Sequence, residues 1–217
     1  MKASAAVLTG DLIGSTAAGP AAVSAAMLRI ETVAERLDAP FQFARFRGDG
    51  WQIYLDEPGL GLATALRIIA SLRAAEGLES RIAVGLGDAV FAQAATASTD
   101  LSLGSATGSA FTASGRALDE MQKNRRLVVA GSGLDRLHYR LVSMIDARVL
   151  RWSHEQAEVL ETALGPGNVS TQEWMAEKHG ITRQAVAARL RAADFAQVNG
   201  AAVDFYLHFS KDHTNDD

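Results

Sequence analysis

Two acidic residues lie where the sequence pattern places strand ends and turns, Asp11 and Asp49. Asp11 lies near the end of a buried strand expected over residues 5–12. Asp49 lies at the Asp-Gly tip of a hairpin expected within residues 41–55. Neighbouring carboxylates repel each other unless a divalent cation lies between them, so we predict that this pair binds Mg²⁺ or Mn²⁺ for phosphoryl or nucleotidyl transfer. The alternative is ordinary turn and capping chemistry at each acid.

Two further features suit a phosphorylated ligand. The turn Gly14-Ser15-Thr16 leads into an expected helix, and free backbone amides at such a position bind polyphosphates. Thr112 and Arg116 are four residues apart on a helix expected over residues 109–123, so they share one face. Arg116 could meet the negative charge of a phosphate in a transition state. Its alternative role is a solvated side chain beside the acids that follow it.

The elements that would position these residues follow the order β-α-β-β-α-β. Strands are expected at 5–12, twice within 41–55 and at 81–90, with helices at 20–38 and around 62–72. This order predicts an α+β, ferredoxin-like unit with two helices on one face of an antiparallel sheet and the first and third strands adjacent. A loop over 92–107, the helix at 109–123 and a strand at 126–130 follow.

Composition narrows the class of protein. The 217 residues include 25 acidic and 21 basic side chains, a net charge of −4, and no cysteine. A disulfide-stabilised module and a cysteine zinc site are therefore excluded. The five histidines show no ligand spacing. No apolar run is long enough to cross a membrane, so we expect a cytoplasmic protein.

The C-terminal third has a different character, with helices expected at 154–164, 171–179 and 182–193. The segment 195–209 is either a hairpin turned by Asn199-Gly200 or a final helix. Gly180 separates two of the helices in a helix-turn-helix pattern, which predicts DNA binding through residues 170–193. The side chains expected to contact DNA are polar or basic: Thr182, Arg183, Gln184, Arg189 and Arg191. The alternative is a helical hairpin used for dimerisation.

We therefore expect two domains and a tail: a nucleotide- and metal-binding domain over 1–148, a helix-turn-helix domain over 149–210, and a disordered tail over 211–217. Trp152 and Trp174 are expected to pack in the small core rather than to stack on bases. The acidic helix that opens the second domain is expected to face away from DNA.

Four segments follow in the order found in class III nucleotide cyclase homology domains: LTGDLIGST, FRGDGWQIYL, RIAVGLGD and GSAFTASGRAL. The chain more closely resembles the SatD-like family of bacterial proteins. That family shares a G-D-[IL]-I-G-S start, an R-G-D-x-[FW]-Q hairpin, a similar G-x-A-F helix and a C-terminal helix-turn-helix. The resemblance covers residues 5–120 by motif and 150–200 by pattern.

The resemblance implies particular roles for these residues. Asp11 and Asp49 would be the metal ligands, and Arg116 would be the transition-state arginine, donated across a homodimer interface. The phosphates would be held by Leu12, Ile13, Gly14, Ser15 and Thr16. The family's ribose-orienting asparagine is Thr112 here, and its purine-selecting lysine has no clear counterpart, although Arg45 or Arg47 would lie in that neighbourhood.

We accordingly expect a nucleotide-responsive, DNA-binding transcriptional regulator with a degenerate cyclase-like domain, acting as a homodimer. A nucleoside triphosphate is the expected ligand. One alternative is an active Mg²⁺- or Mn²⁺-dependent nucleotide cyclase or nucleotidyltransferase, for which the triphosphate would be the substrate. Another is a catalytically inactive scaffold in which both acids are turn residues.

Overall fold

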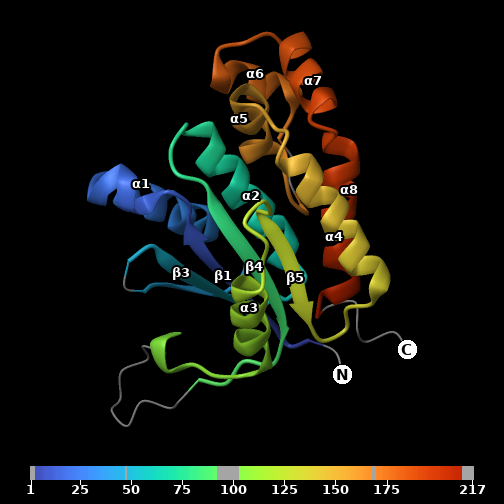
Figure 1. Ribbon diagram of the computed structural model, residues 1–217. Helices are drawn as coiled ribbons and strands as arrows, with labels where there is room; N and C mark the ends of the chain where they lie inside the picture. Colours follow the sequence, from blue (N-terminus) through green and yellow to red (C-terminus); the bar gives the residue numbers. More distant parts are fainter. Residues whose placement is uncertain (1–2, 47, 92–102, 168–169, 212–217) are drawn as a thin grey trace.

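The computed structural model describes residues 3–46, 48–91, 103–167 and 170–211 (Figure 1). Over these ranges it is an α+β structure with one five-stranded mixed sheet and eight α-helices. The first half contains β1 (Ala5–Leu12), α1 (Ser15–Glu35), β2 (Phe41–Arg45), β3 (Gly50–Leu55), α2 (Leu60–Ala74) and β4 (Ser80–Gly87). The second half contains a 3₁₀ turn (Leu103–Ser105), α3 (Ser109–Asp119), β5 (Leu127–Gly131), α4 (Arg136–Val149), α5 (His154–Ala163), α6 (Gln172–His179), α7 (Arg183–Ala192) and α8 (Phe195–Phe209).

Strand β1 lies at the centre of the sheet, whose order is β2-β3-β1-β4-β5. It pairs antiparallel with β3 on one side and with β4 on the other. In this register Asp11 lies opposite Gly50 of β3 and opposite Arg81 of β4. Strand β5 extends the sheet by pairing parallel to β4. The register therefore places Arg81 directly across from the acid of β1.

The two faces of the sheet are covered by different helices (Figure 1). Alternate residues of each strand point to opposite faces, and Ile82 and Val84 belong to the main core together with residues of α1 and α2. Ala83, between them, packs instead with Leu118 of α3 and with Met121. Helices α1 and α2 therefore form one layer, and α3 covers part of the other face.

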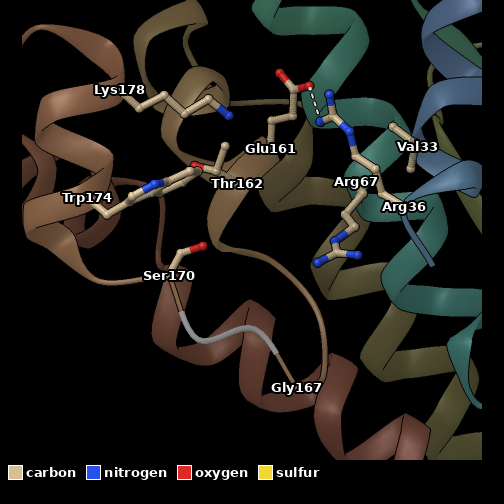
Figure 2. A pocket seen from close by; sticks show the side chains of 9 residues that line it. All are labelled: Val33, Arg36, Arg67, Glu161, Thr162, Gly167, Ser170, Trp174 and Lys178. Atoms are coloured by element: carbon tan, nitrogen blue, oxygen red, sulfur yellow. Dashed lines mark ion pairs between the residues drawn. The ribbon is translucent and has the colours of Figure 1, made fainter. Parts of the chain in front are cut away.

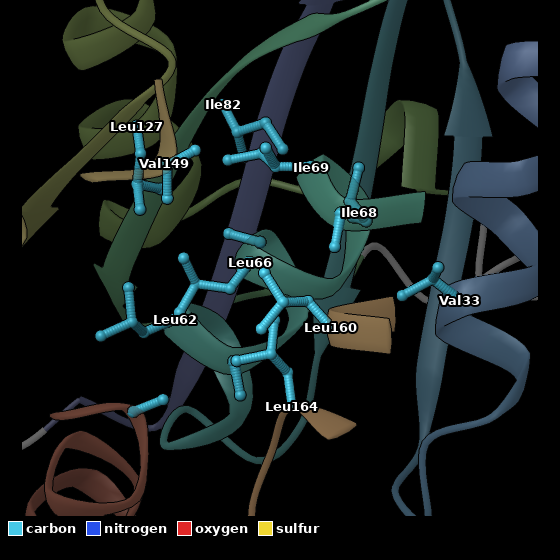
Figure 3. Packing of buried hydrophobic residues seen from close by; sticks show 14 of the residues in the cluster. Val33, Leu62, Leu66, Ile68, Ile69, Ile82, Leu127, Val149, Leu160 and Leu164 are labelled. Carbon is cyan, nitrogen blue, oxygen red and sulfur yellow. The ribbon is translucent and has the colours of Figure 1, made fainter. Parts of the chain in front are cut away.

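Helix α2 is buried between the sheet and the C-terminal helices (Figure 3). Leu62 and Leu66 of α2 belong to the same hydrophobic cluster as Leu160 of α5 and Leu164. The cluster continues into α7 and α8 through Leu190 and Phe205. One continuous core thus joins residues from both of the predicted domains. No helix among the described residues has the length and apolar character needed to span a bilayer.

The structure decides between the two alternatives left open at 195–209 and differs from the sequence predictions in two other places. The segment 195–209 is the single helix α8, because Phe205 and Phe209 are buried on one face of it. Helix α4 was not predicted, although Asp135 and His138 form a capping box at its start. Trp152 is buried as expected, but the prediction for Trp174 was wrong, since 47% of it is exposed.

The ends of the chain and the longest loop are described only in part. Of the loop expected over 92–107, residues 92–102 lie outside the described ranges, as do residues 212–217 of the expected tail. Lys211, the first residue of that tail, forms an ion pair with Asp56 at 2.9 Å.

Candidate functional site

The carboxylate of Asp11 is already paired with a basic side chain. Arg81 donates from Nε to Asp11 Oδ1 at 3.0 Å and from Nη2 to Oδ2. These hydrogen bonds raise the pKa of Arg81 above its usual value, and the negative charges of Asp119 and Asp49 act in the same direction. The repulsion that would recruit a cation to two bare carboxylates is therefore reduced at Asp11 by an arginine on the neighbouring strand.

Asp49 lies in the β2–β3 turn, close to the backbone of β1. The amide of Leu12 donates to the carbonyl of Asp49 at 3.2 Å, and the hydroxyl of Ser15 donates to its carboxylate. The turn residue is thus tied to both sides of the β1–α1 connection. These hydrogen bonds place Asp49 next to Ser15, at the start of the Gly14-Ser15-Thr16 turn.

The two acids line different cavities. Asp11 lines a cavity of about 260 Å³ together with Leu12, Ile13, Arg81 and Lys123. Asp49 lines a separate cavity of about 490 Å³, whose other described lining residues include Ser15, Thr16, Pro20 and Arg45. A cation shared by both carboxylates would need Arg81 to leave Asp11. The residues, as arranged, do not fit a two-carboxylate metal site.

The predicted phosphate-binding turn is only partly available to a ligand. The amides of Leu12 and Ile13 already donate to the carbonyls of Asp49 and Glu79, at 3.2 and 2.8 Å. Ser15 and Thr16 begin α1, where first-turn amides have no partner within the helix.

The helix behind these amides is interrupted. Gly19 has a φ of 83° and breaks α1 just before Pro20. The long helical segment, with its dipole, therefore begins after the predicted phosphate turn.

Thr112 and Arg116 are placed on the exposed side of α3. Ala110, Ser114 and Leu118 face the sheet, whereas Thr112 and Arg116 are both exposed. Neither is among the described residues that line the cavities beside Asp11 and Asp49. Within one chain, the structure therefore does not bring Arg116 to the predicted site. Arg47, predicted to bind the nucleotide, lies outside the described residues.

Helices α6 and α7 are joined by a tight turn. Thr171 caps α6 by accepting a hydrogen bond from the amide of Trp174, and Thr182 caps α7 by accepting from the amide of Ala185, both at 3.1 Å. Gly180 ends α6 with a φ of 63°, a left-handed conformation that favours glycine. The positions of both helices agree with the sequence prediction.

The five residues predicted to contact DNA differ in accessibility. Thr182, Arg183, Gln184 and Arg191 are exposed. Arg183 forms a surface ion pair with Glu173 of α6 at 2.9 Å. Arg189 is only 24% exposed and donates to Glu158 of α5 at 2.8 Å, so it ties α7 to α5. The acidic helix α5 was expected to face away from DNA, but its Glu158 lies against Arg189 of the predicted DNA-contacting helix α7.

A comparison with models of known protein families found no match, and a comparison with curated proteins found none either. The resemblance to SatD-like proteins and to class III cyclases therefore rests on the motifs alone.

The sequence analysis missed two groups of residues. Arg81 lies in the quoted segment RIAVGLGD, but its pairing with Asp11 depends on β4 lying next to β1. Trp174 and Lys178 line a cavity with Arg36 and Arg67, which come from helices far away in the sequence. The four-residue spacing of Trp174 and Lys178 on a predicted helix was a readable signal for that second group.

Proposed function

We propose that the chain is a nucleotide-responsive, DNA-binding transcriptional regulator in which α6 and α7 form a helix-turn-helix and the cyclase-like unit binds rather than converts its ligand. The observation that carries the proposal is the exposed start of α7. There Thr182, Arg183 and Gln184 follow a tight turn and project from a capped helix end. Such residue types at the start of a recognition helix contact phosphates and base edges.

The geometry of α7 supports a recognition role. Val186 and Leu190 are buried on one side of the helix, and Gln184, Ala188 and Arg191 are exposed at spacings of four and three residues. These exposed residues share one face, as a helix lying in the major groove requires. Arg183 can join them because its ion pair with Glu173 is fully on the surface, where such pairs are weak.

The first part of the chain supports a ferredoxin-like unit. The strand order β2-β3-β1-β4, with α1 and α2 on one face, is the order that such a unit requires. The pairing of Arg81 with Asp11, and Thr112 in place of asparagine, favour binding over cyclisation.

The proposal is tested by measuring DNA binding and turnover on the same preparation. A labelled duplex from the region upstream of the chain's own gene is titrated with the full chain, beside a shuffled duplex, at fixed salt. We expect at least about a thousandfold preference for the natural duplex. Adding ATP or GTP should change that affinity, while chromatography shows the nucleotide unconsumed.

Equal affinity for both duplexes would overturn the DNA-binding role. A cyclic or shortened nucleotide product would support the enzyme alternative. Unchanged DNA affinity with every nucleoside triphosphate would remove the nucleotide response from the proposal.

A further inference from the structure

A cavity of about 500 Å³ lies between α1 and α2 on one side and α5 and α6 on the other (Figure 2). We call it the junction pocket. Its volume is in the range of pockets that hold small organic ligands. Its polar lining consists of Arg36, Arg67, Glu161, Thr162, Ser170 and Lys178, and Trp174 supplies an aromatic wall. It lies apart from the cavities that contain Asp11 and Asp49.

One wall of the junction pocket presents an aromatic ring with a cation beside it. Trp174 on α6 is a large aromatic side chain that packing leaves half-exposed. The Nζ atom of Lys178, one turn later, lies 5.1 Å from the centre of the ring. An indole that lines a hollow can stack on a planar ligand, and a nearby cation favours one that carries negative charge.

The opposite wall holds two arginines, Arg36 and Arg67 (Figure 2). Arg36 pairs with Glu161 at 3.7 Å, but Glu161 is shared with Arg29 at 3.9 Å. Arg67 donates from Nε to the carbonyl of Leu164 at 2.6 Å. Burial lowers the pKa of Arg67, and the positive charge of Arg36 lowers it further.

The pocket therefore has an excess of positive charge. Among the described residues, three cationic side chains line it against one carboxylate, that of Glu161. Across the described part of the chain, no carboxylate lies within ion-pair distance of Arg67 or Lys178. An anion that enters between the two walls would relieve the repulsion of Arg36 and Arg67 and replace the solvation that Arg67 has lost.

We propose that the junction pocket binds a planar aromatic molecule that carries a phosphate or carboxylate group, with its ring on Trp174 and its anionic group at Arg36 and Arg67. A nucleoside monophosphate and an aromatic carboxylate share this chemistry. Such a ligand would bridge α1 and α2 to α6, the helix that precedes α7. The site stands independently of DNA binding by α7, which gives it a test of its own.

The test is isothermal titration calorimetry on the full chain without added metal. The ring-and-anion probes are AMP, GMP and 4-hydroxybenzoate. Adenosine supplies a ring without the anion, and pyrophosphate supplies the anion without a ring. We expect at least one ring-and-anion probe to bind, and adenosine and pyrophosphate to bind at least about tenfold more weakly than that probe. Binding of the nucleotides alone, or of the benzoate alone, identifies the source of the ligand.

Tryptophan fluorescence locates the binding. Trp51 and Trp152 are buried, so quenching by a bound probe reports mainly on Trp174. Trp174→Phe should lose the quenching but keep calorimetric binding, whereas Trp174→Ala and Arg36→Gln should each weaken binding by about tenfold or more. Arg140→Gln, an exposed arginine on α4, is the matched control and should bind as the wild type does.

The proposal is overturned if no ring-and-anion probe binds at about 5 mM, or if adenosine binds as tightly as AMP. It is also overturned if Trp174→Ala and Arg36→Gln bind normally while circular dichroism shows them folded. If either variant unfolds, Lys178→Gln, whose side chain is exposed, takes its place under the same criterion. Loss of DNA binding leaves these outcomes unchanged, so the two proposals fail separately.

Discussion

Arg81 on β4 donates hydrogen bonds to both carboxylate oxygens of Asp11 on β1, directly across the strand pair. The pair forms because β1 lies between β3 and β4, so the acid of one strand faces the base of the next. It converts a candidate metal ligand into one half of an ion pair. A cation that bound Asp11 would therefore have to displace Arg81.

Without the guanidinium of Arg81, the carboxylate of Asp11 should bind divalent cations more tightly. We expect Arg81→Met to bind Mn²⁺ at least about tenfold more tightly than the wild type, because both oxygens of Asp11 become free. The free-Mn²⁺ signal in electron paramagnetic resonance measures this. Lys123→Met, which lines the same cavity without pairing to Asp11, is the control. Tight Mn²⁺ binding by the wild type that is lost in Asp11→Asn would contradict the prediction.

The exposed arginines of α7, Arg183 and Arg191, should contribute to DNA binding, whereas Arg189, which pairs with Glu158, should contribute to stability. If α7 contacts DNA, Arg191→Ala should lower the slope of log affinity against log salt by about one, because one phosphate contact is lost. Arg183→Ala should cost about 1–3 kcal/mol of binding free energy if that side chain reads a base. Both are measured by fluorescence anisotropy at several salt concentrations.

Arg189→Ala serves as the comparison on the same helix. Its pairing with Glu158 predicts a loss of about 1 kcal/mol in the free energy of unfolding and little change in the salt slope. A larger loss of DNA affinity in Arg189→Ala than in Arg191→Ala would contradict this prediction, because Arg189 and not Arg191 would then be the side chain that contacts DNA.

The buried carboxylate of Asp146 on α4 should be important for stability. It accepts hydrogen bonds from the amides of Arg126 and Leu127 at 2.8 and 2.9 Å and from Arg125 Nε at 3.1 Å. Asp146→Ala leaves buried donors at the start of β5 without an acceptor. We expect it to lower the free energy of unfolding by about 2–4 kcal/mol, measured with urea.

Two further variants serve as controls for the effect of Asp146→Ala on stability. Asp146→Asn keeps a carbonyl oxygen as an acceptor and should lose less stability than Asp146→Ala. Asp204→Ala, at an exposed position on α8, should change stability by less than about 0.5 kcal/mol. Equal effects of Asp146→Ala and Asp204→Ala would argue against the role of these hydrogen bonds.

His179 should make the protein sensitive to mild acid. Burial lowers the pKa of His179, and the positive charges of Lys178 and Arg189 lower it further, while Glu158 and Glu161 oppose the shift. The unfolded chain therefore takes up a proton near pH 6.5 before the folded chain does, and stability falls as the pH drops through that value. We expect Tm to decrease between about pH 7.5 and pH 5.5 less in His179→Gln than in the wild type.

Lys178→Gln tests the cause of this acid sensitivity. It removes one neighbouring positive charge but leaves the burial of His179 unchanged. The decrease in Tm should therefore be intermediate between those of the wild type and His179→Gln. An identical pH dependence in all three proteins would rule out His179 as the titrating group.

Local features of the sequence predicted individual elements well. Helices α5, α6 and α7 lie where the sequence predicted them, because the caps and amphipathic faces that define a helix act over one or two turns. Helix α4 was missed although its capping box was visible at Asp135. The alternatives at 195–209 stayed open because Asn199-Gly200 suits a hairpin, while the burial of Phe205 and Phe209 against other helices favours α8.

The sequence by itself determined the order of the strands and helices from β1 to β4, the positions of the acids near turns, and the polar start of α7. Only the tertiary structure decided that Arg81 neutralises Asp11, that Arg189 is occupied by Glu158, and that Arg36, Arg67, Lys178 and Trp174 line one pocket. Caps, turns and periodicity act between near neighbours in the chain. The charge balance of a site, in contrast, depends on which distant strands and helices pack side by side.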